Sequence, residues 1–253
     1  MSFAILKSYG YVLLYFCERY GISNAFQTDE GLVKRSFDGV FMETLTYDKG
    51  WIAAVVLLAC AVFGYLLGSI NFAVIISRLF YHDDVRAHGS GNAGATNMLR
   101  TYGRGAGIAT FLLDGVKGAV AVLGSMLLMG EGGAYIAGLF CILGHIFPVF
   151  YKFKGGKGVV VSAVTILALD PVVFLCLLAL FVLIVGMSKY ISLGSIICAF
   201  FYPLLLNAFS QGQGFLSATI SVLIAAIVIV MHKSNIKRLM NRTESKVSFR
   251  KKV

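Results

Sequence analysis

Long apolar runs separated by short polar loops follow one another from Trp51 towards the end of the chain. A bilayer core about 30 Å thick requires about 20 helical residues. Seven runs approach that length: 52–79, 106–129, 132–151, 156–169, 171–187, 190–209 and 214–231. The fourth and fifth are short and meet at Asp170-Pro171, so one kinked or re-entrant element there would leave six spans. The pattern therefore predicts an all-α polytopic membrane protein with six or seven transmembrane helices.

The charges in the loops favour seven spans. With seven, the loops on one side hold Glu131, Asp170 and Ser210–Gln213 and no Lys or Arg. All basic loops then lie on the other side, together with the C-terminal tail. Because basic loops stay in the cytoplasm, we expect seven transmembrane helices, the N-terminus outside and the C-terminus cytoplasmic. The polar loops then face the cytoplasm.

Composition supports a membrane domain with two appended segments. The chain is 58% hydrophobic, and its mean hydropathy is +0.83. Residues 1–50 carry five Lys/Arg and six Asp/Glu and no span, so we expect an N-terminal extension of unknown role, a membrane domain at 51–232 and a basic tail at 233–253. The net charge of +10 fits anionic lipid better than nucleic acid. The five cysteines show no C-x-x-C spacing, and we predict no metal site.

The segment Asp84–Arg100 is an island of glycine and small polar residues between apolar runs. Glycines let backbone amides approach a ligand, and the arginines add permanent charge. The candidate ligands for a phosphate or another oxyanion are Arg86, Ser90, Asn92, Thr96, Asn97 and Arg100. Gly89–Gly94 also matches G-x-G-x-x-G, but no strand precedes it, which argues against dinucleotide binding.

A second polar stretch, Lys152–Gly158, reads K-F-K-G-G-K-G. Its glycines could turn amides towards a phosphate while the lysines supply charge, although Lys and Gly are also usual in short cytoplasmic turns. The sequence does not match a Walker A loop. The candidate ligands here are Lys154, Gly155, Gly156, Lys157 and Gly158.

Further polar residues stand at the ends of apolar runs. His232 and Asn235 share one helical face directly after the last span, where a basic helix would also serve to bind anionic headgroups. Asp114 and Lys117 are spaced i, i+3 inside the second run, and charges at such places are functional candidates. A structural ion pair is the favoured interpretation for them, and a histidine bonded inside the bundle for His145.

Together these stretches resemble the bacterial membrane-bound acyl-phosphate:glycerol-3-phosphate acyltransferases over about residues 51–248. The resemblance rests on Gly68-Ser69, the Asp84–Arg100 island, Asp114-x-x-Lys117-Gly118, His145-x-x-Pro148 leading into F-K-G-G-K-G, and H-x-x-N-I-K-R-L before T-E. Two positions differ from the family pattern: Asn71 stands where a proline is common, and Arg242 where a glycine usually precedes T-E.

The resemblance implies transfer of an acyl group from acyl phosphate to the sn-1 hydroxyl of glycerol 3-phosphate, giving lysophosphatidate without a cofactor. It implies Ser90, Arg100, His232 and Asn235 as catalytic residues, the glycine loop as a phosphate site, and Glu244 as a structural residue. Partners would be both substrates, membrane lipid and an upstream enzyme that forms acyl phosphate.

The chemistry requires cations near two phosphates, and Arg86, Arg100, Lys117, Lys154 and Lys157 are candidates. The residues leave the general base open: either His232 or the phosphate of glycerol 3-phosphate could take the hydroxyl proton. We favour the phosphate because the site has many cations and few bases. An anion transporter is the main alternative, but the outer loops carry no cations. A lipid-binding scaffold is another.

Overall fold

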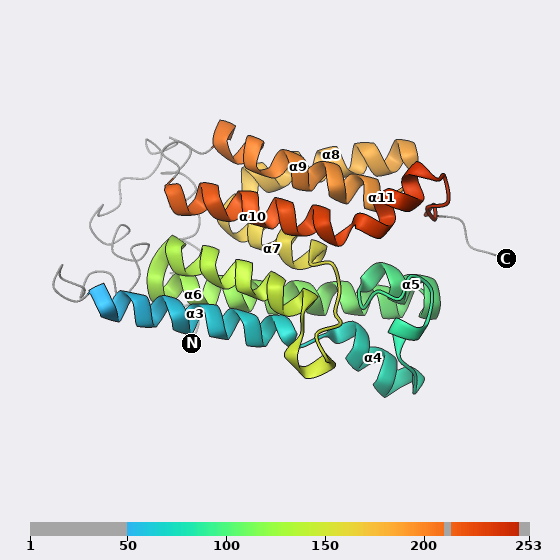
Figure 1. The fold of residues 1–253 in the computed structure, drawn as a ribbon, viewed down its shortest axis with the longest axis horizontal. Helices are drawn as coiled ribbons and strands as arrows, with labels where there is room; N and C mark the ends of the chain where they lie inside the picture. Colours follow the sequence, from blue (N-terminus) through green and yellow to red (C-terminus); the bar gives the residue numbers. More distant parts are fainter. Residues whose placement is uncertain (1–49, 210–213, 248–253) are drawn as a thin grey trace, which may run out of the picture.

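A computed structural model describes residues 50–209 and 214–247, and this part of the chain is all helical (Figure 1). Its α-helices are α3 (Gly50–Ser69), α4 (Phe72–Tyr81), α5 (Ala95–Tyr102), α6 (Arg104–Ile146), α7 (Val159–Leu169), α8 (Pro171–Ser188), α9 (Ile191–Phe209), α10 (Phe215–Met231) and α11 (Lys233–Met240). Two short 3₁₀ helices, Val85–Ala87 and Val149–Tyr151, lie in the loops. The predicted domain boundaries at residues 50 and 232 are not tested by this arrangement, and residues 1–49 lie outside the described part.

Helix α6 is a hairpin rather than one straight rod. Met129 and Gly130 have non-helical backbone angles, and Gly130 has a φ of +59°. Lys117 Nζ lies 3.0 Å from His145 Nδ1, although 28 residues separate them. Along a straight helix these residues would be about 42 Å apart. The two limbs therefore run antiparallel, as Figure 1 shows, and they meet at their polar residues.

The first predicted segment, 52–79, is broken into two helices. Helix α3 ends at Ser69, and α4 begins after Asn71. Asn71 accepts a hydrogen bond from the Val74 amide at 3.1 Å as the N-cap of α4, and its Nδ2 contacts the Ala93 carbonyl at 3.4 Å. Such capping satisfies an amide that the helix start leaves unpaired. The apolar pattern continued through this break, so hydrophobicity alone did not reveal it.

The helices pack in two groups with α7 between them. Helix α3 lies along α6, α8 to α10 contact one another, and α7 contacts both α6 and α8. The contact between α3 and α6 is close: a Cβ on Gly68 would lie 2.2 Å from the Cys141 carbonyl oxygen. Helices α4, α5 and α11 lie at one end of the molecule (Figure 1), and each of them adjoins a polar loop.

Within residues 50–209 and 214–247, four helical stretches are long and apolar enough to cross a bilayer: Trp51–Tyr81, Arg104–Tyr151, Pro171–Ser188 and Ile191–Phe209. A fifth candidate is α10 with α11, which are bent by 55°. Helix α7 is apolar but has only 11 residues, or about 16 Å. The outer surface carries large exposed apolar side chains such as Leu58, Leu127 and Leu183, which suits contact with lipid.

Candidate active site

A cavity of about 310 Å³ opens where α5, α7 and α11 begin. Its polar lining comes from the island after α4, the start of α7, the hairpin α6, the start of α9 and the C-terminal segment. Those lining residues are Ser90, Asn92, Thr96, Asn97, Arg100, Asp114, His145, Lys157, Ser192, Ser195, His232, Asn235 and Glu244. The three polar stretches of the sequence thus meet in one place, although 142 residues separate Ser90 from His232.

Asn97 shapes the island rather than offering its amide to a ligand. Its Oδ1 accepts the Ser90 amide at 2.9 Å, and its Nδ2 donates to the carbonyls of Val85 and His88, both at 3.0 Å. Gly89 has a φ of +58°, and a Cβ there would lie 2.3 Å from Asn97 Oδ1. The side chain predicted to bind phosphate therefore holds the loop that presents Ser90.

Arg100 and Ser90 are the most open polar side chains of the cavity. Both are exposed, and no side-chain hydrogen bond or ion pair involves either one within the described residues. A guanidinium without a protein carboxylate is available to an anion, which it can bind through two parallel hydrogen bonds. Arg100 therefore has the chemistry expected of a phosphate ligand.

The guanidinium of Arg86 is bound by other groups of the protein. It forms an ion pair with Asp84 at 2.7 Å and donates to the carbonyls of Tyr151 at 3.0 Å and Lys154 at 3.1 Å. The hydrogen bonds from Arg86 hold the pKa of the Asp84 carboxyl well below its usual range. Arg86 thus joins the island to the 152–158 loop, and neither it nor Lys154 lines the cavity, in contrast to their prediction as phosphate ligands.

Gly155 and Gly156, in the 152–158 loop, also have a structural role. The Gly155 amide donates to the Ile146 carbonyl and the Gly156 amide to the His145 carbonyl, each at 3.0 Å. These bonds satisfy carbonyls that the C-terminal end of α6 leaves unpaired. The two amides are therefore not available to a phosphate, contrary to the prediction. Gly158 lines the cavity at the N-cap of α7 with a φ of +77°.

Lys157 is the cation of this loop that reaches the cavity. Its Nζ donates to Asn235 Oδ1, which links the loop to α11. Burial, with the nearby Arg238 and Arg100, lowers the pKa of Lys157 to about 8, and Glu244 opposes the shift. The ammonium is charged at neutral pH and titrates within an experimentally accessible range.

Glu244 fastens the C-terminal segment over the cavity. It accepts hydrogen bonds from Ser192 Oγ at 2.9 Å, Asn235 Nδ2 at 2.7 Å and Arg238 Nε at 2.6 Å. Burial favours the protonated acid, but the bonds from Arg238, Asn235 and Ser192 outweigh it and keep the pKa of Glu244 below its usual range. Sequence reasoning missed Ser192, whose only signal was a pair of serines, with Ser195, on one face of an apolar helix.

Asp114, Lys117 and His145 form a buried cluster between the limbs of α6. Lys117 Nζ lies 2.8 Å from Asp114 Oδ1 and donates to the carbonyls of Gly68 at 3.1 Å and Ile70 at 2.6 Å. It therefore fastens the end of α3 to α6. Lys117 does not line the cavity, where it was a candidate phosphate ligand, and it pairs with Asp114 as in the structural interpretation favoured from the sequence.

Four helices begin at the cavity. Residues of the first turns of α5 (Ala95, Thr96), α7 (Val159, Val160), α9 (Ile191, Ser192) and α11 (Asn235) line it. The first amides of a helix have no partner within the helix, and the helix dipole adds partial positive charge there. Together with Arg100 and Lys157, these helix starts make the cavity suited to more than one phosphate group.

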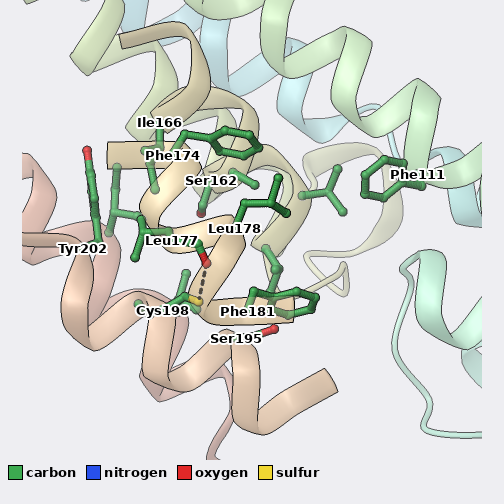
Figure 2. A pocket seen from close by; sticks show the side chains of 16 residues that line it. Phe111, Ser162, Ile166, Phe174, Leu177, Leu178, Phe181, Ser195, Cys198 and Tyr202 are labelled. Carbon is green, nitrogen blue, oxygen red and sulfur yellow. Dashed lines mark hydrogen bonds between the residues drawn. The ribbon is translucent and has the colours of Figure 1, made fainter. Parts of the chain in front are cut away.

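An apolar groove of about 220 Å³ continues from the polar cavity (Figure 2). Five residues line both spaces: Phe111, Val159, Val160, Phe181 and Ser195. Further along, the groove is walled by α7, α8 and α9, where Ile166, Phe174 and Tyr202 lie. Phe111 and Leu178 remain 53% and 43% exposed, so the groove is open on the lipid side.

Fold and site thus define a helical membrane protein in which a polar cavity with two cations, Arg100 and Lys157, adjoins an apolar groove. The sequence profile of the family described as glycerol-3-phosphate acyltransferase matches residues 58–242. A glycerol-3-phosphate acyltransferase of Thermoanaerobacter sp. strain X514 is 44% identical over 188 residues, covering 74% of this chain and 93% of its own. One of Finegoldia magna is 42% identical over 186 residues, covering 72% and 92%. The chain belongs to this acyltransferase family.

Two crystal structures of PlsY (YgiH), an integral membrane glycerol 3-phosphate acyltransferase, share the fold. Its glycerol 3-phosphate form has a TM-score of 0.68 at 34% identity, covering 76% of this chain and 96% of that one. Its lysophosphatidic acid form has a TM-score of 0.65 at 33% identity, covering 76% and 95%. The present protein is therefore a membrane acyltransferase, and the family assignment made from its motifs is confirmed.

Proposed function

We propose that the protein transfers an acyl group from acyl phosphate to the sn-1 hydroxyl of glycerol 3-phosphate, giving lysophosphatidate and phosphate for phospholipid synthesis. The observation that carries this proposal is the continuity of the polar cavity with the apolar groove through Phe111, Phe181 and Ser195. One space suits two phosphates, and the other suits a hydrocarbon chain. An acyl phosphate needs both at once.

In the proposed reaction the sn-1 oxygen forms a bond to the acyl carbonyl carbon, and the bond from that carbon to the phosphate oxygen breaks. The departing phosphate takes up the hydroxyl proton and leaves as hydrogen phosphate. Because phosphate is a good leaving group, the protein has mainly to bring the substrates together and to stabilise the developing charge. Arg100, Lys157 and Ser90 hold the phosphate groups in this scheme.

His232 orients the attacking hydroxyl in this proposal. Its Nδ1 lies 2.7 Å from the Val228 carbonyl, so Nδ1 carries the proton and Nε2 presents a lone pair. Asn235, which also lines the cavity, is held by Glu244 and Lys157. An acceptor at Nε2 can fix the hydroxyl hydrogen in either role, as a positioning group or as a base.

We also propose the membrane orientation. Counting both limbs of α6 and the short α7 gives seven crossings, which place every basic loop and the C-terminus on the cytoplasmic side and the N-terminus outside. The site then opens to the cytoplasm of a bacterial inner membrane. Glycerol 3-phosphate would reach it from water and the acyl donor from lipid, supplied by an enzyme that forms acyl phosphates.

The test is enzymatic. Purified protein in detergent or lipid, given palmitoyl phosphate and glycerol 3-phosphate, should release phosphate and form 1-acyl lysophosphatidate in equal amounts. Acyl-CoA and acyl-carrier protein, each supplied alone in place of acyl phosphate, should give none. Product formed only from either thioester, or an acyl group found at the sn-2 position, would overturn the corresponding part of the proposal.

A further inference from the structure

We infer that His145 is a further substrate-contacting residue, which donates its Nε2–H to the carbonyl oxygen of the acyl donor, and that Lys117 and Asp114 fix the ring in the form that can do so. The inference rests on the proposed function and adds a residue to its machinery. From the sequence, this histidine was expected to have only a structural role.

The tautomer of His145 follows from its neighbour. An ammonium group has donors and no acceptor, and Lys117 Nζ lies 3.0 Å from His145 Nδ1. Asp114 Oδ1 lies farther from Nδ1, at 3.6 Å, which is too long for a hydrogen bond. Nδ1 therefore carries the lone pair, which leaves the proton of the neutral ring on Nε2. Lys117 is itself fixed by two backbone carbonyls and by Asp114 at 2.8 Å, so the ring meets a donor that cannot turn away.

The Nε2 edge of the His145 ring has no hydrogen-bond partner among the described residues. His145 is only 4% exposed and lines the cavity, and no described residue accepts a hydrogen bond from Nε2. Gly156 packs against this edge of the ring, since a Cβ there would lie 2.0 Å from Nε2.

The position of the Asp114, Lys117 and His145 cluster favours the acyl group over the phosphates as the part of the substrate that His145 contacts. Asp114 lies one helical turn after Phe111 on α6, and Phe111 lines both the polar cavity and the apolar groove. The acyl carbonyl must sit at that junction when its chain lies in the groove. Arg100 and Lys157, by contrast, offer full charges, which suit phosphate. A neutral, rigid donor suits an oxygen that becomes negative only during the reaction.

The two histidines of the cavity are thereby complementary. His232 is fixed by the Val228 carbonyl with its lone pair on Nε2, whereas His145 is fixed by an ammonium with its proton on Nε2. One ring can accept from the attacking hydroxyl and the other can donate to the attacked carbonyl. Each tautomer is set by a different kind of partner on the far side of the ring.

The decisive comparison is His145→Phe against His145→Gln. Phe preserves a flat ring but has no donor, and the Gln amide can place an N–H near the position of Nε2. With palmitoyl phosphate and glycerol 3-phosphate, the Phe variant should lose about 100-fold in kcat with the KM for glycerol 3-phosphate within about threefold. The Gln variant should keep within about tenfold of the wild-type kcat. His82→Gln, at an exposed site outside the cavity, is the matched control.

Two results would overturn the inference: a Phe variant that keeps more than a third of kcat, or a loss confined to the KM for glycerol 3-phosphate. Equal losses in the Phe and Gln variants, with unchanged thermal unfolding, would also do so. Wild-type turnover of the same substrates tests the proposed function separately. If wild-type protein makes no lysophosphatidate, the proposed function fails, whatever the variants do.

A second variant tests the positioning role of Lys117. The only charged groups that act on the His145 ring among the described residues are Asp114 and Lys117, so Asp114→Asn with Lys117→Met leaves the ring free to bind a second proton. The protonated ring still donates from Nε2, while the neutral ring divides between two tautomers. kcat should therefore acquire a fall with rising pH between about 5 and 8. A profile of wild-type shape would contradict the positioning role.

Discussion

Two groups of cations from the same sequence motifs differ in where they lie and in what they bind. Arg100 and Lys157 line the cavity, whereas Arg86 and Lys117 lie behind its wall, bound to carboxylates and backbone carbonyls. The residue types do not distinguish the groups. What distinguishes them is how many of their donors are bound by protein acceptors, which depends on where the chain folds back; Lys157 has one such acceptor, Asn235. A cation with its donors satisfied holds the site together, and one with free donors can bind the substrate.

Among the substitutions that test this difference between structural and cavity-lining cations, the one at Lys117 should have the largest effect, which is a loss of stability. Lys117→Ala would leave Asp114 buried without its cation and would free the end of α3. Removing one partner of a buried ion pair costs about 3–5 kcal/mol. Unfolding of the purified variant in detergent, followed by circular dichroism, should show this loss. The double change to Asp114→Asn and Lys117→Met should recover a large part of it, and no recovery would argue against the pair as the cause.

Arg100 should show the reverse behaviour. Arg100→Ala removes a guanidinium that contacts no described acidic group, so the unfolding midpoint should stay within about 2 °C. Loss of its bidentate phosphate contact should lower kcat/KM by about 100-fold or more. Arg104→Ala, at the first residue of α6 and outside the cavity, is the control. A loss of stability as large as that for Lys117 would place Arg100 in the structural group.

The role of Lys157 as a substrate-binding cation can be tested by pH. Its pKa of about 8 lies well below that of a free lysine because it is buried near Arg238 and Arg100. As pH rises through about 8 the ammonium loses its proton, and kcat/KM, which reports the free enzyme, should fall. Lys157→Arg carries a charge that does not titrate in this range, so this fall should be absent. An identical alkaline limb in both proteins would assign it to another group.

Arg86 should give a smaller effect on both properties. Arg86→Gln loses the ion pair with Asp84 and at least one of the bonds to the 152–158 loop. We expect about 1 kcal/mol of destabilisation for this partly exposed pair and about a tenfold fall in kcat/KM as the loop that carries Lys157 loosens. Arg78→Gln, whose pair with Asp84 is more exposed, should have less effect on turnover.

The smallest effect concerns Arg242, which occupies a left-handed backbone conformation with a φ of +57°. A non-glycine residue there is strained by about 1–2 kcal/mol, and the family pattern has glycine at this point. Arg242→Gly should therefore raise stability by up to about 1 kcal/mol, after the greater chain entropy of glycine in the unfolded state is subtracted. Unchanged kcat would separate this relief from any catalytic role.

The sequence was informative wherever a pattern depended on neighbouring residues. Hydrophobic runs located α8, α9 and α10 to within about two residues, because burial in lipid or protein requires continuous apolar surface. The break at Asn71 was missed because it depends on one capping side chain. The motifs indicated the family correctly and brought Ser90, Lys157 and His232 into consideration for the site.

The roles within the motifs were less predictable, because they depend on contacts between distant segments. Gly155 and Gly156 look like a phosphate cradle in the sequence, yet their amides bind the end of α6. Lys117 was a candidate ligand in the sequence, but its ammonium binds the carbonyls of Gly68 and Ile70, which are 49 and 47 residues away. Ser192 carried no signal that linked it to Glu244, since their hydrogen bond spans 52 residues.

The open side of the apolar groove, where Phe111 and Leu178 stay half exposed, has a consequence for kinetics. A donor entering through that opening comes from a two-dimensional solution, so its saturation should depend on its mole fraction among the surrounding lipids. Diluting the protein and its vesicles together in buffer should leave that saturation unchanged, while the water-borne acceptor would be diluted in the ordinary way. The enzyme would thus follow two concentration scales at once, one for each of its substrates.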